Sequence, residues 1–426
     1  MAGGGVDRLS SLSNDLLRRI LHFAPLKEAA STTALSRRWR EPLWLSSAAV
    51  NLETGVVEKK KHRRRQGHEH NNAHARFFSG SDDLVSAATG ALDAADVPVT
   101  RLTLITWYPD PDYNEVASCY KHLVEVLLSH QATRRVAELQ LVAKDPSGNP
   151  YGQVVNRTFT LDSLQLEKLR ILELTNCRGV QVCHREAVLP RLSSLRLSHC
   201  TQQLGSLQRV IDAAPALTAV RLELQGKETF WQFSRNFTGT KEMRLSVNHL
   251  EDITVLSEAK QVELLPAFRR LQRLEFQGAH WTKDKTAAVT TILNLLHCCP
   301  VLTTLRINLT AKYEEEDASK KQGGHKPKGT TRKEILMAAM VGPRYLFQCL
   351  QTYLRRVDLQ FQLEKKDCLG VRLIKTFAEN AMVLEEICID SGDEKLCEHM
   401  KPRIAKWNSS RKESGATSFV VLPLKR

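Results

Sequence analysis

Pairs of apolar residues separated by a single residue recur through most of this chain of 426 residues. Alternation of this kind predicts short strands with one buried face. Segments 169–177 and 192–200 both match the template L-x-x-L-x-L-x-x-N/C, 23 residues apart. Ten pairs occupy its two central apolar positions: Leu102/Leu104, Leu139/Leu141, Leu172/Leu174, Leu195/Leu197, Val220/Leu222, Met243/Leu245, Leu274/Phe276, Leu305/Ile307, Val357/Leu359 and Ile387/Ile389.

One repeat of this size cannot bury its apolar side chains alone, but stacked repeats share a continuous core. The sequence therefore predicts an α/β fold in which leucine-rich repeats over residues 97–390 form a solenoid with a curved parallel sheet. Some return segments have helical periodicity, including 118–128 and 286–296. The polar stretch 312–332 is predicted to be an insertion in a loop.

The N-terminal segment, residues 9–44, has helical rather than strand periodicity. Leucine and isoleucine recur on one face of a first helix that Ser13 or Asn14 can cap and that Pro25 would end. A short second helix and a third over residues 33–41 are expected to follow. Three short helices cannot bury all their large side chains, so the pattern predicts a partner surface.

The motif Leu12-Ser-Asn-Asp-Leu-Leu, with Ile20-Leu21, Leu35-Ser-Arg-Arg-Trp-Arg and Leu43-Trp44 after it, resembles the F-box of plant F-box proteins with leucine-rich repeats. The resemblance implies docking onto a Skp-type adaptor, which joins the chain to a cullin ubiquitin ligase, while the repeats hold an unknown protein substrate. It departs from the family at Ser13, where proline is usual. The implied adaptor-binding residues are Leu12, Ser13, Leu16, Ile20, Leu21, Leu35 and Trp39.

Together these patterns predict four regions along the chain. They are an F-box at 7–50, a basic loop and approach to the repeats at 51–96, the repeats at 97–390 and a basic tail at 391–426. Within the repeats, segment 349–390 resembles the FBD segment found near the end of such plant proteins.

Positive charge is concentrated in polar segments rather than in the predicted scaffold. The net charge is +14, and segments 59–65, 318–333 and 401–426 each carry +6, which leaves −4 for the remainder. Such composition is typical of solvated loops and tails, so a nucleic-acid partner is not expected. The first segment is also a candidate nuclear localisation signal, which makes residence in the nucleus, the cytoplasm or both an expectation. Its basic residues are Lys59, Lys60, Lys61, Arg63, Arg64 and Arg65.

The residue between the two apolar members of each pair points to the opposite face of the sheet. Arginine occupies this position at Arg196, Arg221 and Arg244 in three consecutive repeats, and again at Arg306. Aligned arginines about 5 Å apart repel one another unless an anion lies between them. One hypothesis is therefore that they bind an acidic substrate segment, a phosphate or an anionic cofactor. The alternative, which we favour, is that flanking glutamates neutralise them within the sheet.

Membrane, metal and catalytic functions find little support in the sequence. The longest charge-free run contains Asn294, His297 and Pro300, so no membrane span is expected. The N-terminus lacks the pattern of a secretory signal, which predicts a reducing compartment. The ten cysteines are therefore expected to be thiols. Zinc donors gather between residues 177 and 200, but their spacing matches no common zinc motif and two of the cysteines fill repeat positions, so no metal is predicted.

No common hydrolase, metalloprotease, phosphate-loop or C-x-x-C motif occurs, and no cofactor is predicted. The resemblance to F-box proteins implies, in agreement, a non-catalytic subunit that promotes ubiquitin transfer by proximity. A binding scaffold without a ligase role, a basic protein that binds nucleic acid, and an enzyme are the alternatives, in that order.

Overall fold

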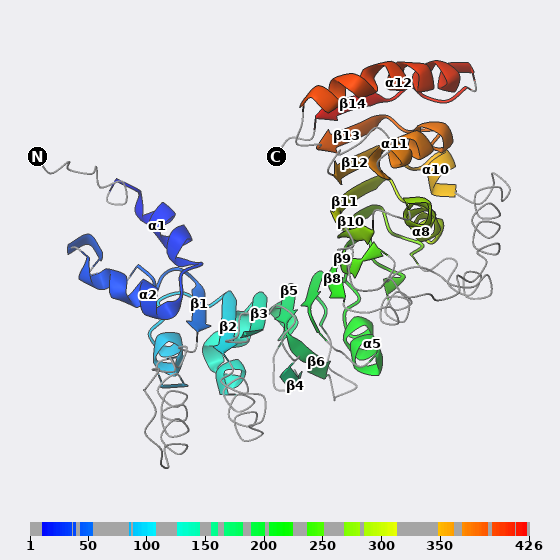
Figure 1. The fold of residues 1–426 in the computed structure, drawn as a ribbon. Coiled ribbons are helices and arrows are strands. Elements are labelled where there is room, and N and C mark those ends of the chain that lie inside the picture. The colour runs from blue at the N-terminus through cyan, green and yellow to red at the C-terminus, as the bar shows by residue number, and fades with distance from the viewer. Residues whose placement is uncertain are drawn as a thin grey trace, which may run out of the picture. The chain divides into compact units, whose positions relative to one another are not determined.

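A computed structural model describes seventeen stretches of the chain, which divide into two compact units, Met1–Leu217 and Thr218–Arg426 (Figure 1). The described residues are 11–35, 37–39, 43–53, 85–86, 88–107, 126–144, 155–160, 166–181, 189–200, 204–224, 237–250, 268–281, 285–312, 348–361, 369–390, 394–413 and 415–423.

The first unit begins with a helical segment and continues as a parallel sheet. The helical segment contains α1 (Asn14–Leu21), α2 (Leu26–Ser31) and two 3-10 turns, η1 (Thr32–Ala34) and η2 (Arg37–Trp39). The sheet strands, in spatial and chain order, are β1 (Ala49–Glu53), β2 (Arg101–Trp107), β3 (Glu138–Lys144), β5 (Ile171–Thr175) and β7 (Ser194–Ser198). Its other elements include β4 (Val155–Thr160) paired with β6 (Cys177–Gln181), the 3-10 turns η3 (Gln131–Arg135) and η4 (Leu166–Lys168), and helix α5 (Leu204–Asp212). Residues 85–86, 88–93 and 126–129 are also helical.

The second unit is built in the same way, with strands in chain order and helices between them. Its strands are β8 (Ala219–Leu224), β9 (Glu242–His249), β10 (Arg273–Trp281), β11 (Thr304–Lys312), β12 (Arg356–Phe361), β13 (Glu386–Asp390) and β14 (Val420–Pro423). Its helices are α8 (Lys285–His297), α10 (Gln348–Thr352), α11 (Leu369–Asn380) and α12 (Glu394–Glu413). Helices α8, α10 and α11 lie on one side of strands β10 to β13 (Figure 1).

The buried face of the repeat strands follows the repeat template in both units. Each of the ten predicted apolar pairs lies in a strand, and every member is at most 5% exposed. The position three residues before each pair is also buried, as Leu169 and Leu302 illustrate at 0%. One strand per layer brings equivalent positions side by side, so that Leu172 lies opposite Leu139 on one neighbour and Leu195 on the other. The α/β fold with a parallel sheet is therefore confirmed.

The third N-terminal helix was predicted over residues 33–41, and the structure differs there. Within that range it shows the end of η1 and the 3-10 turn η2, while residues 36 and 40–42 lie outside the described part. Side chains of Thr32 and Thr33 donate hydrogen bonds to the carbonyls of Ala29 and Ala30, at 2.6 and 2.8 Å. These local bonds favour tight turns where the helix was expected to begin.

The C-terminal segment contains more structure than the expected basic tail. Within 391–426, the structure shows the twenty-residue helix α12 and strand β14, which pairs in parallel with β13. Arg411 explains the order, because its guanidinium is buried and donates to the carbonyls of Ala378, Ala381, Met382 and Thr417 at 2.7–3.2 Å. A positively charged residue here closes the repeat core instead of extending into solvent.

Strand β1 was also missed, because its pair Val50/Leu52 stands directly after the helical motif. These residues are 4% and 1% exposed and occupy the inward positions opposite Leu102 and Leu104.

Of the two return segments with helical periodicity, 286–296 is confirmed by α8, whereas most of 118–128 lies outside the described residues. Within the described part of the chain, no helix is both long and apolar enough to cross a membrane.

Candidate functional site

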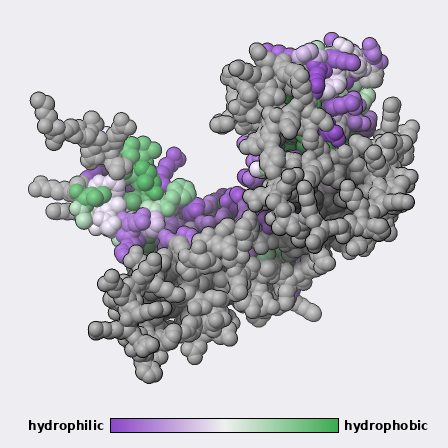
Figure 2. All heavy atoms as spheres, in the orientation of Figure 1, coloured by the Kyte–Doolittle hydropathy of each residue, from purple (hydrophilic) through white to green (hydrophobic). Residues whose placement is uncertain are grey.

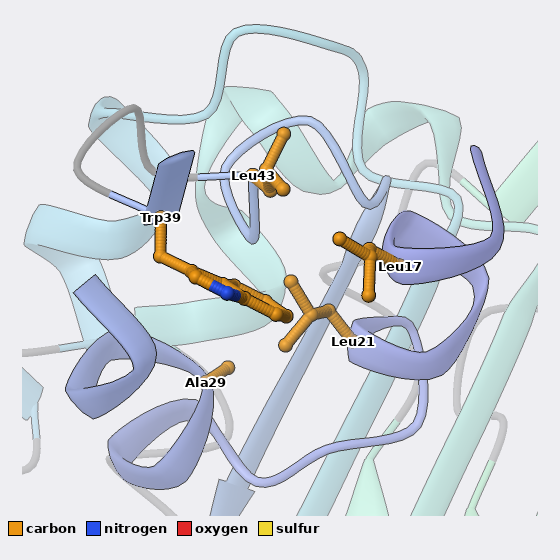
Figure 3. Packing of buried hydrophobic residues seen from close by; sticks show 5 residues of the cluster. All are labelled: Leu17, Leu21, Ala29, Trp39 and Leu43. Carbon is orange, nitrogen blue, oxygen red and sulfur yellow. The ribbon is translucent and has the colours of Figure 1, made fainter. Parts of the chain in front are cut away.

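The N-terminal module, residues 11–47, has a small core of its own (Figure 3). Leu17 and Leu21 point from α1 toward the ring of Trp39, and Ala29 from α2 and Leu43 complete the cluster. All five are at most 6% exposed. This core fixes α1 against α2 although neither helix is longer than eight residues.

Helix α1 has two apolar faces, of which the core uses one. The hydroxyl of Ser13 accepts a hydrogen bond from the Leu16 backbone N–H at 3.4 Å and so caps the helix, as predicted. Leu17 and Leu21 are buried, but Leu16 and Ile20, four residues apart on another face, are 46% and 50% exposed. The single predicted stripe is therefore divided between an internal and an external role.

Exposed apolar side chains continue beyond α1. Leu35, after η1, is 65% exposed, and Phe23, between α1 and α2, is 66% exposed. Hydrophobic surface is visible over α1 and over the end of α2 (Figure 2). We call Leu16, Ile20 and Leu35 the apolar patch. Among described residues of the first unit, every large apolar side chain that is exposed to solvent belongs to this module.

The structure thus separates residues that the sequence motif groups together. Leu21 and Trp39 belong to the core, Leu12 is partly buried against it, and Ser13 is the helix cap. The patch residues face solvent. Arg38 joins the ends of the module by donating to the side-chain oxygen of Asn14, with Nε at 3.0 Å and Nη2 at 2.7 Å. Sequence spacing alone could not make this division, because helical periodicity identifies faces but not what covers them.

The module is anchored to the first strands of its unit, a feature that the sequence did not reveal. The side chain of Asn51 in β1 donates hydrogen bonds to the carbonyls of His22 and Ala24, at 2.9 and 3.0 Å. The guanidinium carbon of Arg101 in β2 lies 4.9 Å from the ring centroid of Phe23. These contacts join the loop between α1 and α2 to the outward face of the sheet and leave the apolar patch exposed.

The predicted outward arginines mostly have carboxylate partners within their own units. Arg196 pairs with Glu173 at 3.2 Å in the first unit. In the second unit Arg221 and Arg244 lie opposite each other, as predicted, and each has a carboxylate of its own. Arg221 contacts Glu223 at 2.8 Å, and Arg244 contacts Glu275 at 3.2 Å. This arrangement agrees with neutralisation inside the sheet.

Arg306 in β11 differs from these three. Its side chain is exposed, and among the described residues no carboxylate pairs with it.

The residues opposite Arg306 on the next two strands are Asp358 in β12 and Cys388 in β13. Asp358 accepts a hydrogen bond from Arg356 at 2.9 Å, which raises the pKa of that guanidinium. Burial raises the pKa of the neighbouring Cys388 thiol to about 11.

The cysteines that the structure describes in detail are thiols buried or half-buried in the repeats. None of the five described ones forms a disulfide, and these are Cys200, Cys298, Cys299, Cys349 and Cys388. Burial raises the pKa of Cys298 and Cys349 to about 12. The described residues contain no cluster of three or more metal-ligating side chains. Cys183 and His184, which have donor atoms for zinc but for which no metal was predicted, lie outside the described residues, as does the basic run 59–65.

The sequence of this chain is similar to those of several known plant proteins. No protein-family model matches the chain. An FBD-associated F-box protein of Arabidopsis thaliana is 49% identical over 51 residues, which are 12% of this chain and 27% of that protein. An F-box protein of the same plant is 26% identical over 247 residues, 57% of this chain and 45% of the relative. The relatives of this chain are plant F-box proteins.

Leucine-rich repeats also appear in the names of these relatives. An F-box/LRR-repeat protein of Arabidopsis thaliana is 49% identical over 47 residues, or 11% of this chain and 8% of that protein. The matched regions span less than half of the length of each of these F-box relatives. The resemblance to F-box, leucine-rich-repeat and FBD proteins is confirmed.

Proposed function

We propose that this chain is the substrate-recognition subunit of an SCF-type ubiquitin ligase, in which the N-terminal module docks a Skp-type adaptor and the repeats bind a target protein. The observation that carries the proposal is the apolar patch, which stands on a module whose own core is already filled. Covering a half-exposed leucine contributes on the order of 1 kcal/mol, so an adaptor that covers all three residues gains a useful share of its affinity there.

The proposal needs no catalytic group in this chain. A target held on the repeats and an adaptor held on the module place a target lysine near a ubiquitin-carrying enzyme, and the resulting effective concentration accelerates transfer. The anchor at Asn51 supports this role, because it fixes the module to the first strands of its own unit. A scaffold in which the module packs only against the repeats would more naturally bury the patch.

Adaptor binding by the full chain tests the proposal. The purified chain is mixed with a purified Skp-type adaptor, and the Leu16→Asp/Ile20→Asp variant is measured beside it by calorimetry. Carboxylates in an apolar interface lose hydration without compensation, so we expect at least about hundredfold weaker binding.

Arg19→Asp is the matched control. It lies on the exposed surface of the same helix and changes the net charge by the same two units as the double variant. It is expected to retain adaptor binding, and circular dichroism should show equal helix content in all three proteins. If the unaltered, folded chain binds no Skp-type adaptor, the ligase proposal is wrong and a scaffold role becomes the better explanation.

A further inference from the structure

The outward face of β10, β11 and β12 carries one arginine whose charge the sheet leaves unpaired. Arg306 lies between Glu275 and Asp358 in the strand register. Those two carboxylates are already engaged, by Arg244 at 3.2 Å and Arg356 at 2.9 Å. Arg306 itself is exposed and has no hydrogen-bond or ion-pair partner among the residues that the structure describes.

A row of three amide side chains lies next to this arginine. Gln277, Asn308 and Gln360 are register partners across the three strands, and Asn308 shares the outward face with Arg306 because it lies two residues further along β11. All three side chains are half-buried, and no described residue forms a hydrogen bond with them. Each amide therefore keeps donors and an acceptor available on the surface.

The row of amides is long enough to contact an extended polypeptide. Neighbouring strands are about 4.8 Å apart, so a segment that crosses the three strands passes three amides within about 10 Å, the length of about three extended residues. A side-chain amide presents a donor and an acceptor together, as a peptide group does, and can pair with backbone of any sequence. The arginine adds selectivity, since a guanidinium favours a carboxylate or phosphate partner.

The flanking carboxylates decide between these two anions. Glu275 and Asp358 keep the local charge low, and repulsion from them grows with the charge of the incoming group. A phosphate carries nearly two negative charges at neutral pH, whereas a carboxylate carries one. The site therefore favours a glutamate or aspartate side chain.

We propose that the outward face of β10, β11 and β12 binds an extended acidic protein segment, with a carboxylate on Arg306 and the segment backbone on the row Gln277, Asn308 and Gln360. The inference rests on the proposed function in taking the substrate to be a protein, and it names the class of segment. It also assigns the anion-binding role to Arg306 instead of the paired Arg196, Arg221 and Arg244.

Positional peptide libraries test the proposal with the full chain. The probes are fluorescein-labelled nonapeptides whose central residue is glutamate, glutamine, phosphoserine or lysine and whose other positions are mixed, without proline. We expect the immobilised chain to retain the glutamate library about tenfold more than the glutamine library, because the charged hydrogen bond is made only there. Arg306→Gln should remove this preference, and Arg306→Glu should shift it to lysine.

The matched control is Arg355→Gln, which removes the same charge from an exposed arginine that directly precedes β12 and pairs with Glu385. It should keep the preference for glutamate. Asn308→Ala should lower retention of all four libraries by a similar factor, about threefold, because it removes a backbone contact. Thermal unfolding of each variant should match the unaltered chain, since none of these side chains is part of the core.

Three results would overturn the inference. They are equal retention of the glutamate and glutamine libraries by the unaltered chain, an unchanged preference in Arg306→Gln, or stronger retention of phosphoserine than of glutamate. Adaptor binding is measured separately, so the two proposals fail separately. Adaptor binding without peptide selection removes only this inference, whereas peptide selection without adaptor binding removes only the ligase role.

Discussion

The N-terminal module and the strands that follow it in the first unit differ in how completely they bury their apolar side chains. In β2, β3, β5 and β7 every inward pair is at most 5% exposed. In α1, Leu17 and Leu21 are buried while Leu16 and Ile20 are about half exposed. A strand within a stack has neighbours on both sides, whereas a short helix is covered on one side. The repeats therefore complete their own core, whereas the module leaves apolar side chains exposed.

Truncating one leucine in each region gives the largest expected difference. Leu174→Ala removes a side chain that is 0% exposed and should lower the free energy of unfolding by about 3 kcal/mol, through lost burial and a cavity. Leu16→Ala removes one that already faces water and should cost less than about 0.5 kcal/mol. Urea unfolding of the two variants measures both values. Equal losses would mean that Leu16 is covered in the isolated chain, which contradicts the comparison.

The C-terminal end of the second unit offers a contrasting closure, in which a charged residue does the packing. Arg411→Met should cost about 2 kcal/mol, because four carbonyl oxygens lose the buried guanidinium that donates to them. Hydrogen exchange should increase first in α12 and β14. Lys412→Met changes the same charge at an exposed position and should leave exchange unaltered. Similar exchange in both variants would show that Arg411 does not hold this end.

The attachment of the module to β1 can be weakened without changing either core. Asn51→Ala removes two hydrogen bonds to the loop between α1 and α2 and should cost about 1–2 kcal/mol. Faster exchange is expected in α1 and α2, with β5 and β7 unchanged. Uniform exchange throughout the unit would instead indicate that module and repeats unfold together.

The departure from the family motif at Ser13 should have the smallest effect. Ser13→Ala loses a cap bond of 3.4 Å and should cost about 0.5 kcal/mol. Ser13→Pro loses the same bond, but the φ of −66° at this residue already suits proline, and the stiffer unfolded chain offsets the loss. We expect Ser13→Pro to unfold within about 0.5 kcal/mol of the unaltered chain. A larger loss in thermal unfolding would show that serine is required here.

Much of the repeat architecture could be predicted because its pattern is local. The spacing L-x-x-L-x-L states which side chains face inward, and all ten predicted pairs do so. Strand β1 was not predicted because its single pair, Val50/Leu52, directly follows the helical motif. Strand β14 was not predicted because it lies in a basic segment, and its positions opposite Ile387 and Ile389 are Val421 and Pro423. Composition suggested solvent for 391–426, whereas Arg411 is buried by partners that are distant in sequence.

The candidate sites show the same limit. The motif identified the helix that carries exposed apolar side chains, but Leu16 and Leu17 are adjacent leucines that only packing against Trp39 distinguishes. The positions of Arg221 and Arg244 were predicted in the correct register, yet whether each guanidinium is neutralised depends on which carboxylate reaches it. Arg306 became a candidate site only when the structure showed that Glu275 and Asp358 pair with other arginines. The amide row joined it because no described residue forms a hydrogen bond with those side chains.

The sequence by itself determined the alternation of inward and outward positions, the order of the strands and the presence of a helical module before them, because these follow from periodicities of two and 3.6 residues. Tertiary structure decided which apolar residues remain exposed, which charges are paired and how both ends are closed. Those properties depend on side chains that meet across tens of residues, such as Asn51 with His22 and Arg411 with Ala378. A local sequence pattern does not specify contacts between residues so far apart in the chain.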